Sequence, residues 1–179
     1  MDFWLVLTLV LSFLMAFSIG SNDAANGLGT SYGTKAIPLR YIIINGALAE
    51  FFGAMFCSDK VATTLSGDII KNLTSLDADI QKKMMFSVCL CSFIFIMTSS
   101  FSGMPISGTH TVVGALMGAG VIGGSSMNNV DWHKLVNIFA SWIISPMISA
   151  IVSFLLMTLV ATLTMNTKKI SFRRRLLSQ

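Results

Sequence analysis

The sequence predicts an all-α integral membrane protein, and its composition and the spacing of its charges are the observations that predict it. Of its 179 residues, 54% are hydrophobic and only 11% are charged, and the mean hydropathy is +0.75. A soluble domain carries about 25% charged residues. Three stretches contain no Asp, Glu, Lys or Arg, namely 3–22, 84–130 and 135–167. A membrane-spanning helix needs roughly 20 mostly apolar residues, and each stretch is long enough.

The first expected element begins as a span at residue 3 and meets a polar, glycine-rich segment over 20–34. That segment reads GSNDAANGLGTSYGT and is too polar to face lipid. We therefore expect a helix that is broken there and resumes as far as residue 37. A polar surface turn between two ordinary helices is the alternative. A signal peptide is not expected, because the apolar stretch has no basic residues before it and no Ala-x-Ala site after it.

Two later segments are also expected to depart from simple spans. Gly103, Pro105 and Gly108 interrupt any continuous helix, which predicts a re-entrant or discontinuous helix. Pro146 is expected to kink or divide the last apolar run. A polar loop over 59–83, with a short interfacial helix around 66–73, is expected between the second and third spans. The expected single transmembrane repeat covers 1–167, with spans over 3–37 (broken), 41–58, 84–102, 103–124 (re-entrant) and 135–165, and a basic tail follows over 168–179.

The placement of positive charge predicts the orientation of this multi-pass protein. Lys and Arg crowd the tail over 168–179, and by the positive-inside rule that tail lies on the cytosolic side. The chain would then begin outside and cross the bilayer an odd number of times. Contact with anionic lipid is an alternative role for the tail. Binding of nucleic acid is not expected from a short tail on a chain that is otherwise embedded in a bilayer.

The first polar interruption offers candidate ligands for a cation. Irregular backbone at membrane depth is tolerated where it lines a watery cavity, and transporters build ion and anion sites there. Asp23 would cost about 2.5–3.5 kcal/mol at the centre of a spanning helix, which favours a compensating cation. Asn22 and Asn26 add amide oxygens, which are hard ligands suited to Na+.

The second interruption offers candidate ligands for an oxyanion. Pro105 is suited to the first position of a helix, which needs no N–H group. The amides of the following residues, with the hydroxyls of Ser107 and Thr109, would then suit a tetrahedral oxyanion. His110 could donate to it as well, and a packing histidine is the alternative for that residue alone.

Glu50 is a third candidate, because a carboxylate inside a span is a functional candidate by default. It would relay protons, bind the cation or pair with a basic group, and the alternative is a protonated side chain in a helix contact. The sequence has no paired-carboxylate hydrolase pattern, no HExxH, no Walker loop and no GxSxG. We therefore do not expect an enzyme or a bound cofactor.

Four segments in order resemble the PiT family of inorganic phosphate transporters. The stretch GSNDAANGLGTSYGTKAI resembles the family signature GANDVAN-x-x-GT, and PISGTHTVVGALMGAG resembles the second signature, P-[IV]-S-x-T-H followed by a Gly-rich helix. ASWIISPMIS resembles the ASW-x-x-SP segment, and AEFFGA carries Glu50 where the family has its intramembrane glutamate.

The resemblance implies one repeat of an inverted-repeat transporter, with a broken first helix, a phosphate site shared by two repeats, and Na+ or H+ as the coupling ion. The residues carried over are Asn22, Ser107, Thr109 and His110 for phosphate, Asp23 and Asn26 for the coupling cation and as Na+ ligands if coupling is to sodium, and Glu50 as a functional carboxylate. Position 108 is Gly where some members have Thr, so one hydroxyl is missing.

The signature occurs once here, whereas family members carry it twice. The expected function is therefore cation-coupled phosphate transport as half of a two-repeat transporter, with an inverted second-repeat chain or a larger membrane complex as partner. The alternative is a transport-inactive structural membrane subunit of a larger complex. The sequence does not name the membrane.

Overall fold

The computed structural model describes residues 3–63, 69–71, 73–123 and 127–165. Five α-helices run through these residues: α1 Phe3–Gly33, α2 Leu39–Thr63, α3 Ala78–Phe101, α4 Gly108–Gly123 and α5 Trp132–Met165, with short 3-10 turns at Leu73–Ser75 and Met127–Asn129. α1, α2, α3 and α5 contain segments long and apolar enough to cross a membrane, whereas α4 is shorter. The expectation of an all-α integral membrane protein is confirmed.

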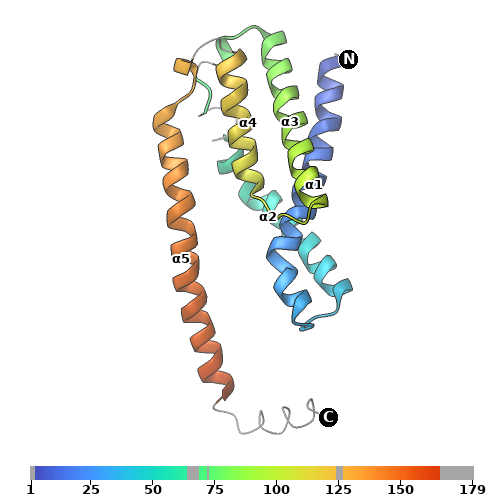
Figure 1. Ribbon diagram of the computed structural model, residues 1–179, viewed down its shortest axis with the longest axis vertical. Coiled ribbons are helices and arrows are strands. Elements are labelled where there is room, and N and C mark those ends of the chain that lie inside the picture. The colour runs from blue at the N-terminus through green and yellow to red at the C-terminus, as the bar shows by residue number, and fades with distance from the viewer. Residues whose placement is uncertain (1–2, 64–68, 72, 124–126, 166–179) are drawn as a thin grey trace. The chain divides into compact units, whose positions relative to one another are not determined.

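The described chain forms two compact units, residues 1–132 and 133–179, which we describe separately. In the first unit α1 packs mainly against α3, and α3 packs against α4 (Figure 1). α2 makes fewer contacts with α1. Large apolar side chains such as Phe13, Phe56 and Phe95 are exposed on these helices. Apolar side chains on the surface cost free energy in water, but they cost none where lipid hydrocarbon covers them.

The expected break in the first helix was wrong, because α1 is one continuous helix from Phe3 to Gly33. No proline lies within it, and a single glycine costs a helix only about 1 kcal/mol. Two serine hydroxyls near this segment are satisfied by the helix itself: Ser18 donates to the Met15 carbonyl and Ser21 to the Ser18 carbonyl. Polar composition alone therefore does not interrupt the helix.

α1 ends in a Schellman motif whose left-handed residue is not glycine. Lys35 has φ 54°, and its N–H donates to the Tyr32 carbonyl at 3.0 Å. The N–H of Ala36 donates to the Ser31 carbonyl at 3.2 Å, which completes the motif. The chain then turns, and the carbonyl of Pro38 accepts the first amide hydrogen bonds of α2.

The seam between α1 and α3 is lined by small and polar residues. Ser18 and Ser92 are fully buried there, and the Ser12 hydroxyl lies 3.5 Å from the Cys89 sulfur. Trp4 and Phe86 meet edge to face at one end, with ring centroids 5.5 Å apart. Because lipid removes most of the hydrophobic driving force between helices, close packing of small residues is what holds such seams together.

α3 and α4 form an antiparallel pair joined by a non-helical linker over 102–107 (Figure 1). The expected interruption of the helix near Gly103 and Pro105 is therefore observed. At the other end of the pair, residues 69–71 bond to residues 129–131: the Lys71 N–H donates to the Asn129 carbonyl at 2.7 Å, and the Asp131 N–H to the Ile69 carbonyl at 2.9 Å. This contact ties the connection after α2 to the end of α4.

The region between α2 and α3 differs from the expected loop. α2 continues to Thr63 and α3 already begins at Ala78. The interfacial helix expected around 66–73 falls partly on residues 64–68 and 72, which lie outside the described residues. The described part of that stretch, residues 69–71, belongs to the paired contact with 129–131.

In the second unit, α5 is one helix with Pro146 inside it, so this proline does not divide the last apolar run. The rings of Phe139 and Trp142 lie one turn apart along it and are tilted by 58° to each other, with 4.7 Å between their centroids. The basic tail over 168–179 lies outside the described residues.

Candidate functional site

Asn22 joins α1 to both ends of the linker between α3 and α4. Its side-chain N–H donates to the Ser100 hydroxyl at 2.9 Å, and that hydroxyl donates to the Ile96 carbonyl at 2.9 Å. Its amide oxygen accepts from the backbone N–H of Ile106 at 3.3 Å and from Asn26 at 3.1 Å. Asn22 is buried, with 6% of its surface exposed. It therefore fixes the position of the linker, and one of its two side-chain N–H groups remains available to a ligand.

The linker begins with a sharp turn that requires glycine. Gly103 has φ 68°, a conformation that residues with a Cβ rarely adopt. The turn is closed by two hydrogen bonds between the same residues: the Met104 N–H donates to the Ser99 carbonyl at 3.0 Å, and the Ser99 hydroxyl donates to the Met104 carbonyl at 2.6 Å. The chain then runs from α3 past Asn22 to the start of α4.

Ser107 is the N-cap of α4. Its hydroxyl oxygen accepts from the His110 N–H at 3.3 Å, and its carbonyl accepts from the Thr111 N–H at 3.1 Å. The expectation that Pro105 takes the first helical position was wrong, because α4 begins at Gly108. Serine is a preferred N-cap, and the Ile106 N–H is already held by Asn22. The amides of Gly108 and Thr109, the first two of the helix, have no partner within it.

Gly108 brings the start of α4 against α1. It is buried, and a Cβ added to it would lie 3.3 Å from the Ile19 Cγ2 atom. A larger side chain there would need Ile19 to move. Position 108 therefore lacks the threonine hydroxyl of some family members, and its glycine lets α4 approach α1 closely.

A cavity of about 170 Å³ lies between α1 and the linker. It exceeds the space that one water molecule needs. Its lining residues are Ser21, Asn22, Ala25, Asn26, Ser100, Gly103, Met104 and Pro105. The structure thus brings the two polar segments, about 80 positions apart in the sequence, to one cavity. We call it the polar cavity because half of its lining residues are polar.

The expected site residues take different places around this cavity. Asn22 and Asn26 line it, and Ser107 ends the linker that borders it. Asp23 is exposed on α1, and Thr109 and His110 are exposed on the first turn of α4. Sequence reasoning missed Ser100 as the partner of Asn22. Its signal was the polar triplet Thr98-Ser99-Ser100 at the end of an apolar span.

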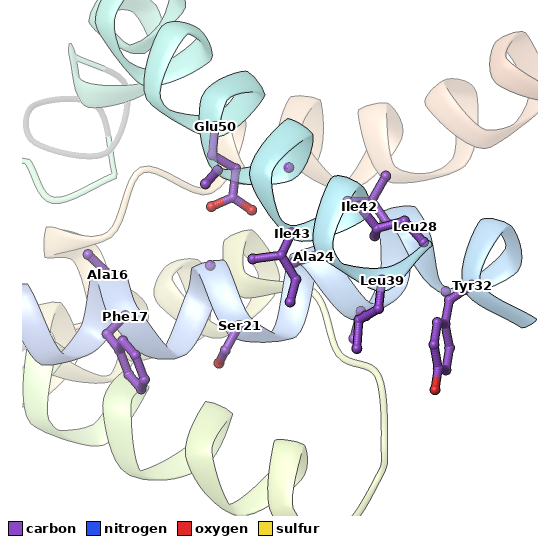
Figure 2. Close-up of a pocket in the computed structure, with 15 residues that line it drawn as sticks. Ala16, Phe17, Ser21, Ala24, Leu28, Tyr32, Leu39, Ile42, Ile43 and Glu50 are labelled. Carbon is purple, nitrogen blue, oxygen red and sulfur yellow. The ribbon is translucent and has the colours of Figure 1, made fainter. Parts of the chain in front are cut away.

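Glu50 does not line this cavity but lies in a groove between α1 and α2, which shares Ser21 and Ala25 with the cavity. The groove has a volume of about 640 Å³ and is lined mainly by apolar and small residues. Figure 2 shows the carboxylate of Glu50 pointing from α2 toward α1. Farther along the groove, Leu28 of α1 packs on Gly46 of α2, and a Cβ at Gly46 would lie 2.8 Å from the Leu28 Cδ1 atom.

In the described part of the chain, four helices long and apolar enough to cross a bilayer define a polytopic membrane protein, and the polar cavity between α1 and the linker is its candidate functional site. Residues 19–178 match the Phosphate transporter family, and the chain belongs to that family. The resemblance noted from its motifs is confirmed.

Several relatives are similar to most of the chain. A protein of Pyrococcus horikoshii named "Putative phosphate permease" is 35% identical over 154 residues, which cover 86% of this chain and 38% of the relative. The chloroplastic Inorganic phosphate transporter 2-1 of Arabidopsis thaliana is 35% identical over 152 residues, covering 83% of this chain and 25% of the relative.

A solved structure, described as the sodium-dependent phosphate transporter, matches with a TM-score of 0.84 and 30% identity. The match covers 93% of this chain and 41% of that one. The chain therefore spans well under half the length of the relatives that it matches.

Proposed function

We propose that this chain forms one repeat of a cation-coupled phosphate transporter and contributes phosphate ligands and a cation ligand set to its site. The observation that carries the proposal is the meeting of residues 22–26 and 100–107 around one polar cavity, because these segments contain the motifs that resemble the family signatures. The names of the relatives support phosphate as the substrate.

The proposed phosphate ligands are groups that still have a hydrogen to donate. The Ser107 hydroxyl accepts from the His110 N–H, which leaves its own hydrogen free to donate to an oxyanion. The amides of Gly108 and Thr109 begin a helix, where an anion is stabilised by unpaired N–H groups and by the helix dipole. We add the Thr109 hydroxyl and the second side-chain N–H of Asn22 on the same ground. His110 is added because it belongs to the motif that resembles the second family signature.

The proposed cation ligands are Asp23 and Asn26. Residues three apart on a helix are neighbours on its surface. Asn26 uses its N–H group toward Asn22, so its amide oxygen can turn to a cation. Among the described residues no three His, Cys, Asp or Glu side chains cluster as a metal site. Coupling to Na+ would therefore use one carboxylate with amide and carbonyl oxygens. The sodium-dependent relative favours Na+ over H+.

The proposed partner is a second repeat of opposite orientation. Asp23 is exposed, and hydrocarbon would offer it no hydrogen bonds. A second repeat that covers this side of α1 would remove that cost and could supply the remaining ligands. The relatives, which are more than twice as long as the matched segment, leave room for one.

Uptake of labelled phosphate tests the proposal. The native assembly that contains this chain would be purified in mild detergent and reconstituted into liposomes. We expect phosphate to accumulate when a Na+ gradient points inward. Accumulation with a pH gradient alone would assign H+ as the coupling ion. No uptake under either gradient, from an assembly that retains its fold, would favour the transport-inactive structural subunit.

Removal of single hydroxyls at the start of α4 tests the phosphate ligands. A hydrogen bond to a charged group contributes about 1.5–3 kcal/mol, so Ser107→Ala or Thr109→Val should weaken phosphate affinity roughly tenfold to over a hundredfold. Phosphate binding would be measured by isothermal titration at constant Na+.

The control for Ser107 is Ser107→Gly. Glycine keeps most of the capping free energy, whereas alanine loses about 1 kcal/mol of it. If the hydroxyl binds phosphate, both variants lose affinity. If Ser107 only caps the helix, Ser107→Gly binds like the wild type, and the assignment of this residue is wrong.

A further inference from the structure

The carboxylate of Glu50 lies against the backbone of α1 at a residue that has no side chain. An ideal Cβ on Gly20 would be 2.9 Å from the Glu50 Oε2 atom and 3.9 Å from its Cδ atom. The shorter distance is one that real Cβ atoms essentially never show to a neighbouring heavy atom. A methyl group at position 20 and the carboxylate of Glu50 cannot both occupy their present places.

The groove around this contact is built from small residues on α1. Ala16, Gly20 and Ala24 follow one another at four-residue spacing and line the groove that α2 faces (Figure 2). Residues four apart share one face of a helix. Within that row, Gly20 is the position that meets the acidic side chain of Glu50. It also lies two residues before Asn22, so it links Glu50 to the helix that carries the candidate site.

A substitution at Gly20 can change the position of the Glu50 carboxylate without disturbing the fold. The atoms that an added methyl group would displace are the far end of a flexible side chain. Alanine is also a better helix former than glycine. A Gly20→Ala protein should therefore fold and insert normally, and the change should move the Glu50 carboxylate away from α1.

We propose that Gly20 is a positioning residue for Glu50, because its missing side chain lets the carboxylate rest on α1 beside the Asn22 segment. The inference rests on the proposed transport function of the chain, to which we add Glu50 as the functional carboxylate that the family resemblance implies. It adds that this function depends on where the carboxylate lies as well as on its presence.

Transport kinetics give the first test, in the reconstituted native assembly. A shift of about 1 Å in a functional group can cost on the order of a hundredfold in rate. We expect Gly20→Ala to lower the maximal rate of phosphate uptake by about tenfold or more, with less change in the KM for phosphate, which the linker residues bind.

A shorter acid should restore the position of the carboxylate. Aspartate is shorter than glutamate by one bond of about 1.5 Å. We expect Gly20→Ala combined with Glu50→Asp to transport faster than Gly20→Ala alone. A general packing defect at position 20 would not be corrected by shortening residue 50, and failure of this rescue would overturn the proposal.

Two glycines on α2 provide matched controls. Gly46→Ala adds the same methyl group to the same helix pair but meets Leu28, which is apolar, and Gly53→Ala adds it where no atom lies within 4 Å. Both should transport close to the wild type. A loss in Gly46→Ala as large as in Gly20→Ala would mean that helix packing alone is at work, and would overturn the proposal.

A chemical readout separates this inference from the proposed function. Glu50 is the sole glutamate of the chain. Its modification by dicyclohexylcarbodiimide can therefore be followed by peptide mass spectrometry without any transport assay. We expect the rate of modification to change several-fold in Gly20→Ala and to be unchanged in Gly46→Ala. Equal rates in Gly20→Ala and wild type would overturn the positioning role. Normal transport by Glu50→Gln would instead overturn the functional role of Glu50.

Discussion

Asp23→Asn is expected to abolish cation-dependent phosphate uptake while membrane insertion stays normal. The substitution keeps the shape of the side chain and removes its charge. A carboxylate on a spanning helix costs about 2.5–3.5 kcal/mol at the bilayer centre, so removing it should not harm insertion. The bound cation would lose its one charged ligand on α1. Initial rates of labelled phosphate uptake would be measured across a range of Na+ concentrations.

Asp59→Asn is the control, because Asp59 is an exposed carboxylate near the end of α2 and does not line the polar cavity. It should keep the wild-type rate and Na+ dependence. Unchanged uptake and unchanged Na+ dependence in Asp23→Asn would remove Asp23 from the cation site.

Asn22→Ala should lower both stability and phosphate affinity. The change leaves the Ile106 N–H and the Asn26 amide without the oxygen that they now share. A buried donor left unsatisfied costs about 1–3 kcal/mol. The linker and the start of α4 would lose their attachment to α1, so phosphate affinity should fall by about a hundredfold or more. Thermal unfolding in detergent and phosphate titration would be measured on the same preparation.

Asn22→Asp separates the two effects. A carboxylate still accepts from Ile106 and Asn26, so thermal stability should return in part, reduced by the cost of burying a charge. The added negative charge repels phosphate, so affinity should remain low. An Asn22→Asp protein that binds phosphate as tightly as the wild type would show that Asn22 does not face the anion. Asn45→Ala, on the exposed side of α2, should change neither property.

The helical fold could be predicted because long apolar runs without charged residues form spanning helices in a bilayer. The interruption after α3 could be predicted as well, since Gly103 and Pro105 disfavour a helix through their own backbone, without any distant partner. The continuity of α1 could not. Its polar segment resembles a break in composition, but Ser21 is satisfied within the helix and Asn22 is satisfied by Ser100, 78 residues later. Local composition does not reveal a partner at that distance.

The candidate site could be predicted in part for the same reason. Asn22 and Asn26 stand out as amides in a membrane segment, and Ser107 stands out as a hydroxyl two residues after a proline. The choice of Ser107 over Pro105 as the start of α4 depends on the Ile106 N–H being held by Asn22. The contact of Glu50 with Gly20 depends on how α1 and α2 cross, which residue spacing within each helix does not specify.

Protection of a cavity residue by phosphate tests the central claim most directly. Met104 lines the polar cavity, and Met127 is exposed in the turn after α4, outside it. Each would be changed to cysteine in a background in which Cys57, Cys89 and Cys91 are alanine. The rate of modification by a charged methanethiosulfonate would be measured in the native assembly with Na+, with and without phosphate. The account predicts that phosphate slows modification of Met104→Cys several-fold and leaves Met127→Cys unchanged, whereas equal rates at Met104→Cys with and without saturating phosphate would contradict it.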